Sequence, residues 1–226
     1  MTEPDGIQTA IQRSMLRVAV RNSARSVPLL TVAVVFIAWL GWDAGNGRAA
    51  LATLALGLPV AVWRLVLGLK HRDTHSLAPE RAHALELQLE ANALLVGVMW
   101  VVATVFIYPT LRGTTATVYV VIVCGSVSMA AFFMSMAGRS FLLLTGMQLG
   151  SLAAVSLFST QAYSLALAVL ALLFGVTMTR ATLEFRNTAL RAVRNSLQAD
   201  QASASLVRAK EAAEAANLAR ASSWQP

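Results

Sequence analysis

The sequence predicts an all-α membrane protein with six transmembrane helices and a cytoplasmic C-terminal signalling helix. Three observations predict this fold class. Of the 226 residues, 57% are apolar and only 13% are charged, about half the charged fraction usual in soluble domains. The apolar residues form long runs without the period-two alternation of barrel strands. From residue 181 the chain is instead rich in Ala, Leu, Glu, Gln and Arg, which favour a helix in water.

Six apolar runs are long enough to cross a bilayer. A hydrocarbon core about 30 Å thick requires roughly 20 mainly apolar helical residues per crossing. In chain order the runs cover about residues 27–42, 49–69, 87–108, 117–137, 141–158 and 162–179. Turn-forming segments separate them, at 43–47 (DAGNG), 108–113, 138–139 and 159–161. We therefore divide the chain into an N-terminal segment (1–25), a six-span membrane domain (26–180) and a signalling helix (181–226).

Basic residues near the ends of these runs predict the orientation in the membrane. The opposite loops carry only Arg48 and Arg112. Both termini should therefore be cytoplasmic, in a bacterial inner membrane, and the first apolar run is not preceded by a cleavable signal peptide. The residues on the expected cytoplasmic side are Arg13, Arg17, Arg21, Arg25, Lys70, Arg72, Arg81, Arg139, Arg180, Arg186, Arg191 and Arg194.

The N-terminal segment has an amphipathic pattern. Ile7, Ile11, Met15 and Val18 share one helical face, and basic and amide side chains occupy much of the rest. This pattern is typical of a helix that lies on an anionic membrane surface. The alternative is a positive flank that only sets the topology.

The C-terminal segment contains an imperfect heptad repeat, which predicts a coiled coil and hence a homodimer through this helix. Charged residues interrupt the repeat at Arg186, Asp200, Glu211 and Glu214. A solvated amphipathic tail is the alternative. The expected contact seam of the signalling helix consists of Leu183, Leu190, Val193, Leu197, Ala204, Val207 and Leu218.

Residues 209–220 (AKEAAEAANLAR) and Ser222 closely resemble the helix that leads into the dimerisation domain of membrane sensor histidine kinases. The match falls on Ala213, Ala216, Asn217, Ala219 and Arg220. In that family the helix continues into a phosphoacceptor S-H-E, whereas residues 221–226 here read ASSWQP. We therefore expect the input part of such a kinase, without its phosphoacceptor histidine and ATP-binding domain.

The membrane domain is similar to the six-span input region shared by hybrid histidine kinases and diguanylate cyclases. Residues 94–100 (LLVGVMW) and 125–131 (GSVSMAA) carry this resemblance. It implies a sensory input module of a two-component system that passes a membrane or periplasmic cue to a dimeric cytoplasmic helix. Short external loops favour a lipophilic ligand, a membrane property or a partner in the membrane as the cue. Input to a diguanylate cyclase and a small six-span transporter are the alternatives.

The sequence does not predict catalysis or a cofactor. It contains no phosphate-binding glycine loop, no H-E-x-x-H, no G-x-S-x-G and no paired cysteines. The basic residues lie beside apolar runs, so nucleic acid is not an expected partner. His71, Asp73 and His75, with His83 nearby, could bind a metal, although Arg72 and Arg81 favour a solvated turn. Met129, Met134, Met136 and Met147 with Cys124 could bind Cu(I), but methionine is common in apolar cores.

Five polar residues in or near the spans are candidates for packing or signal relay: Arg64, Glu86, Glu90, Asn92 and Gln148. Because the second and third spans are antiparallel neighbours, we expect Arg64 to pair with Glu90. Asn92 and Gln148 need hydrogen-bond partners inside the membrane. Gln148 lies within a Gly146-x-x-x-Gly150 pattern, which predicts a close helix approach there.

Overall fold

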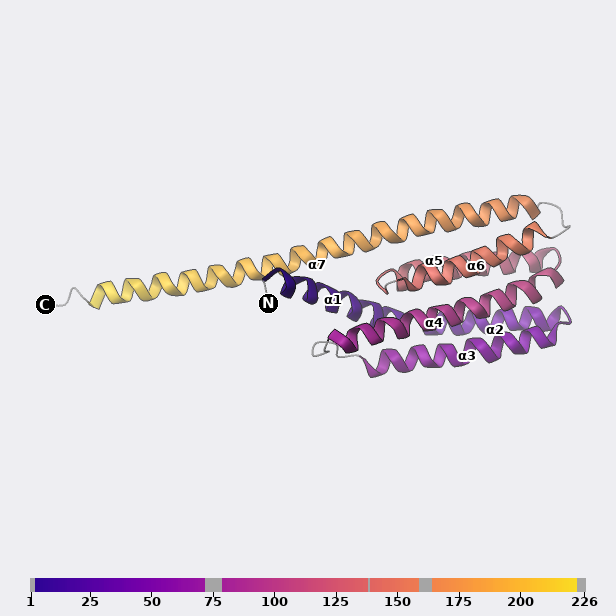
Figure 1. Cartoon of the computed structure of the whole chain (residues 1–226), viewed down its shortest axis with the longest axis horizontal. Helices are drawn as coiled ribbons and strands as arrows, with labels where there is room; N and C mark the ends of the chain where they lie inside the picture. The colour runs from indigo at the N-terminus through magenta and orange to yellow at the C-terminus, as the bar shows by residue number, and fades with distance from the viewer. Residues whose placement is uncertain (1–2, 72–78, 138, 159–163, 223–226) are drawn as a thin grey trace. The chain divides into compact units, whose positions relative to one another are not determined.

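The computed structural model describes residues 3–71, 79–137, 139–158 and 164–222, and these are almost entirely helical (Figure 1). The described part of the chain contains no strand, so the all-α prediction is confirmed. The elements are α1 (Glu3–Arg25), α2 (Val27–Asp43), α3 (Gly47–Lys70), α4 (Pro79–Phe106), the 3-10 helix η1 (Tyr108–Thr110), α5 (Thr114–Met134), α6 (Ser140–Leu157) and α7 (Ser164–Ser222).

In the part of the chain that the structure describes, five helical stretches are individually long and apolar enough to cross a membrane. They are Gly47–Lys70, Glu80–Thr110, Thr114–Met134, Ser140–Leu157 and Ser164–Ser196. A sixth is present if the bent pair Ser14–Arg25 and Val27–Asp43 is one span. The described residues therefore fit a multi-pass membrane protein with five or six candidate spans.

The bend between α1 and α2 has a local cause. Pro28 occupies the first turn of α2 and has no N–H to continue the α1 ladder. The hydroxyl of Ser26 instead donates to the carbonyl of Ser23 at 2.7 Å. The two helix axes differ by 40° at this point.

The C-terminal half of α1 packs into the bundle rather than presenting the expected face. Met15, Leu16, Ala19 and Val20 are buried, whereas Val18 is 40% exposed. The apolar face is thus rotated relative to the sequence expectation, because neighbouring helices and not lipid cover it. The side chains of residues 1–10, including Ile7, lie outside the described residues.

The chain forms two compact units, residues 1–186 and residues 187–226. Within the first unit, α2 to α6 run in alternating directions (Figure 1), and α4 packs against both α3 and α6. Met99, Trp100 and Ala103 of α4 are fully buried with Ile37 of α2 and Tyr119 of α5. The core of the bundle therefore surrounds α4.

Glycines permit the closest helix approaches in this unit. A Cβ added to Gly57 of α3 would lie 2.6 Å from both methyl carbons of Val34 on α2, and one added to Gly68 would lie 2.3 Å from Cβ of Ala24. Gly146 and Gly150 have no such neighbour within 4 Å. The predicted close approach at the Gly146-x-x-x-Gly150 pattern is therefore wrong, because α6 turns its glycines outward.

Gly57→Leu should lower the free energy of unfolding by about 1–3 kcal/mol, because Val34 is β-branched and cannot move away from the new side chain. Gly150→Leu is the matched control, since open space surrounds that position. Denaturant titration in mixed micelles measures both variants. Equal losses for the two would contradict the tight α2–α3 contact.

Candidate functional site

Arg64 is the centre of a polar cluster inside the first unit. It lies near the C-terminal end of α3, and only 3% of its surface is exposed. The position is about 9 Å from the end of the helix, at 1.5 Å per residue. Its neighbours in the sequence of α3 are apolar, so Arg64 is part of the apolar stretch of the helix and not of its polar end.

Two side chains from different helices hold this guanidinium. Nε of Arg64 donates to Oδ1 of Asn92 on α4 at 2.7 Å, and Nη1 donates to Oγ of Ser26 at 3.1 Å. Asn92 in turn donates from Nδ2 to the carbonyl of Val60 at 3.0 Å. The cluster therefore ties the α1–α2 junction, α3 and α4 together.

The cluster leaves one end of the guanidinium without a partner. Nη2 of Arg64 is buried and has no hydrogen-bond partner among the described residues. Among the described residues, no carboxylate forms an ion pair with Arg64. A buried cation without a counter-charge is costly, which makes this arrangement unusual.

A cavity of about 480 Å³ adjoins Arg64, within the range typical of small-molecule sites. Its walls come mainly from α2 and α5, with Arg64 from α3, Val96 from α4 and Leu144 from α6. Apart from Arg64 and a few hydroxyl groups, the lining is apolar. The arrangement suits an apolar molecule with an anionic end.

The expected pair of Arg64 with Glu90 is wrong. Oε1 of Glu90 instead accepts a hydrogen bond from the backbone N–H of Arg139 at 2.9 Å. Arg139 is the N-cap of α6, where a carboxylate is favoured by the helix dipole. Glu86 is half-buried one turn earlier on α4. Glu90 thus caps a neighbouring helix rather than neutralising the arginine.

Gln148 hydrogen-bonds across helices, as its position predicts. Its Nε2 donates to the carbonyl of Val123 on α5 at 3.3 Å, and the residue is fully buried. Its Oε1 has no partner among the described residues. Gln148 does not line the cavity beside Arg64, so the structure separates it from the Arg64 cluster.

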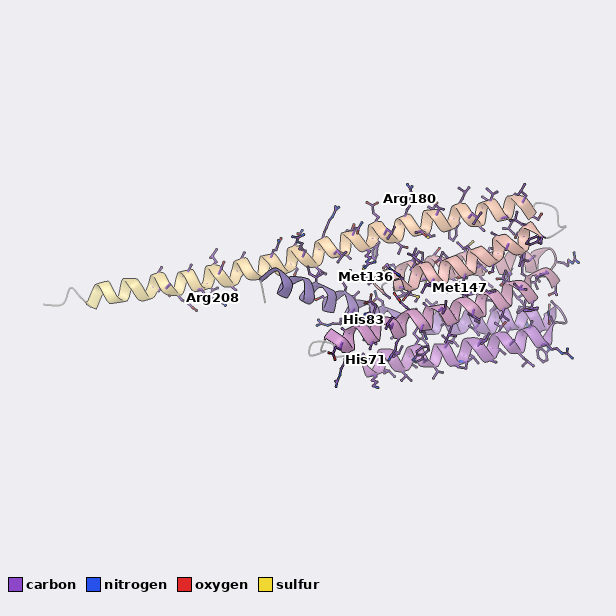
Figure 2. All side chains as sticks on the ribbon, in the orientation of Figure 1. His71, His83, Met136, Met147, Arg180 and Arg208 are labelled. Atoms are coloured by element: carbon purple, nitrogen blue, oxygen red, sulfur yellow. The ribbon has the colours of Figure 1, made fainter. Side chains whose placement is uncertain are left out.

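Among the described residues, no histidine belongs to a cluster that could hold a metal ion. No group of three or more His, Cys, Asp or Glu side chains is assembled there. Asp73 and His75 lie outside the described residues. Nδ1 of His71 lies 3.1 Å from the carbonyl of Leu67 at the end of α3. Figure 2 labels His71 and His83 together with Met136 and Met147.

Ser26 and the groove between α2 and α5 were not anticipated from the sequence. Ser26 resembles any serine before a proline-containing helix start, so the sequence does not mark it as a partner of Arg64. The sequence feature that could have indicated the groove is the pair of small residues Gly125 and Ser126 in α5, since both line it.

The geometry defines an all-α multi-pass membrane protein with a buried cationic site beside an apolar cavity. Neither protein-family models, nor curated proteins, nor solved structures show a significant match to this chain.

Asn92→Leu should lower the free energy of unfolding by about 3–5 kcal/mol, because it leaves the buried Arg64 charge without its Nε acceptor. Adding Arg64→Met to that variant should recover most of the loss, since an apolar side chain then replaces the orphaned charge. Titration of unfolding in mixed micelles measures the cycle.

Glu90→Gln is the control for this cycle. It retains an oxygen that can accept from Arg139 and should change the free energy of unfolding by less than about 1 kcal/mol. Strictly additive losses in the double variant would contradict the coupling of Arg64 with Asn92.

Proposed function

We propose that this chain is the transmembrane sensory input module of a two-component histidine kinase, delivering a membrane or periplasmic cue to a dimeric cytoplasmic helix. The observation that carries the proposal is α7. It is one helix from Ser164 to Ser222, apolar enough to span a membrane through its first part, Ser164–Ser196. It then continues into the polar stretch that resembles the linker helix of sensor kinases.

The limited packing of the first part of α7 supports this role. Leu165, Leu170 and Val176 are each more than half exposed. Its contacts in the first unit include buried Ala168 and Ala171, a contact of Gly175 with Leu149, and the ring of Phe185 at 6.1 Å from that of Phe132. A helix with so few contacts can shift or rotate at small energetic cost.

Part of the seam on α7 is exposed in the single chain, which leaves it available to a second copy. Leu183 is 48% exposed and Val207 is 52% exposed. Ala204 is also exposed, and Leu190 and Val193 are half-buried. The side chains of Leu197 and Leu218 lie outside the described residues. We propose a homodimer in which these seams pack against each other.

The same module can feed a diguanylate cyclase instead, since the membrane resemblance covers both families. The output domain would read the register or separation of the paired helices.

The proposed orientation places both termini in the cytoplasm of a bacterial inner membrane. Single cysteines at Arg48 and Arg112, introduced in a Cys124→Ala background, should react with an impermeant maleimide in intact spheroplasts. Cysteines at Arg25 and Arg180 should react only after the membrane is opened. The reverse labelling pattern would contradict this topology.

Replacing both Leu190 and Leu197 with Asp should abolish disulfide formation between copies that carry Ala204→Cys. Like charges buried between the two paired helices repel each other and drive the helices apart. The measurement is the yield of cross-linked dimer in membranes of the Cys124→Ala background. Ala192→Asp with Ala199→Asp is the matched control, since these residues lie on the opposite helix face and add the same charge. Unchanged cross-linking in the seam variant would contradict the paired-helix model.

A further inference from the structure

The uncompensated charge of Arg64 calls for an anion from outside the described chain. An arginine inside a membrane protein stays protonated, and Asn92 and Ser26 supply only neutral oxygen acceptors. Both N–H groups on Nη2 have no partner in the described part of the chain. This nitrogen and its neighbour Nη1 form an edge of the guanidinium fork, which matches the two oxygens of a carboxylate.

The cavity beside Arg64 is elongated along the helices. Its lining extends from Ser26, the residue before α2, to Phe36 on α2, and on α5 from Thr117 to Met134. At 1.5 Å per residue these stretches are about 15 Å and about 25 Å long. The two helices are antiparallel (Figure 1), so Ser26 and Met134 mark the end near Arg64, and Phe36 and Thr117 mark the far end. One extended acyl chain suits this groove.

The groove is reached from the membrane. Val32 and Val121, which line it, are 66% and 64% exposed, and Leu29 is 46% exposed. In a membrane-spanning bundle such exposed apolar side chains face lipid. An amphiphile dissolved in the bilayer can therefore enter sideways between α2 and α5 without passing through an external loop.

We propose that the groove between α2 and α5 binds a single-chain amphiphilic carboxylate, such as a fatty acid, with the carboxylate on Arg64 and the acyl chain along the groove. The depth of Arg64, about 9 Å inside the end of α3, disfavours a phospholipid, whose glycerol and second chain would have to follow its phosphate inward. The binding site depends only on the packing around Arg64. Its role as the entrance of the cue rests on the function proposed above.

Gly125 provides a way to close the groove without disturbing the bundle. It lines the groove, and a Cβ added there meets no atom within 4 Å. Gly125→Leu should therefore fill the space for the acyl chain while the protein stays folded. Gly150→Leu on α6 is the matched control, because that glycine is equally unobstructed but does not line the groove.

The test uses the full chain in nanodiscs of phosphatidylcholine and a photoactivatable analogue of dodecanoate as the probe. Dodecanoate should displace the probe at roughly ten-fold or more lower concentration than dodecanol, because only the acid offers a charge to Arg64. Arg64→Met should remove this preference. Gly125→Leu should abolish labelling and Gly150→Leu should preserve it, and the labelled peptides should come from α2 and α5.

Three results would overturn the proposal: equal competition by dodecanoate and dodecanol, equal labelling of the two glycine variants, or displacement of the probe by phosphatidylglycerol but not by dodecanoate. The Gly125→Leu comparison decides the matter even if Arg64→Met does not fold. Cross-linking at Ala204→Cys is measured on the same samples. A changed yield with dodecanoate supports the sensory role, whereas binding without any change overturns that role and leaves the binding site standing.

Discussion

The hydrogen bonds of Arg64 are the interaction on which the arrangement of the first four helices depends. Inside a bilayer no water is available to satisfy a guanidinium, so the protein must supply the partners itself. Asn92 and Ser26 do so from α4 and from the α1–α2 junction. This requirement fixes the rotation of α4 about its axis and the position of the bend at Ser26. Nη2 has no partner among the described residues, so the same constraint that orders the bundle leaves a buried hydrogen-bond donor available to a ligand.

The packing of α2 explains why a groove lies beside that arginine. Gly57 lets α2 sit against α3 with Val34 in close contact, and this face of α2 is fully committed to α3. The face toward α5 carries Leu29, Val32 and Phe36, which are partly exposed. On α5 the facing positions include Gly125 and Ser126, which are too small to fill the space between the helices. Tight packing on one side of α2 thus coincides with an open groove on the other.

The positions of the helices could be predicted from the sequence because apolar run length and turn residues are local signals, and each predicted run overlaps an observed helix. The hydrogen-bond partner of Arg64 on α4 could not be predicted from such local signals. Glu90 and Asn92 are two residues apart on α4, so they point about 200° apart around the helix axis, and only tertiary packing decides which one faces α3. Charge complementarity favoured Glu90, yet that carboxylate faces the N-terminus of α6. The groove was likewise hidden, since α2 and α5 are distant in sequence.

A ligand in the groove can influence α7 only if it favours one arrangement of the helices over another. The structure offers a short physical route for such a preference. α5 forms one wall of the groove and also carries Phe132, whose ring lies 6.1 Å from that of Phe185 on α7. Because the other contacts of α7 in the first unit are few, a small shift of α5 would not be opposed by a large packed interface. On the proposed function, the loosely held helix is therefore the element that the cue moves, while the tightly packed α2, α3 and α4 serve as its fixed support.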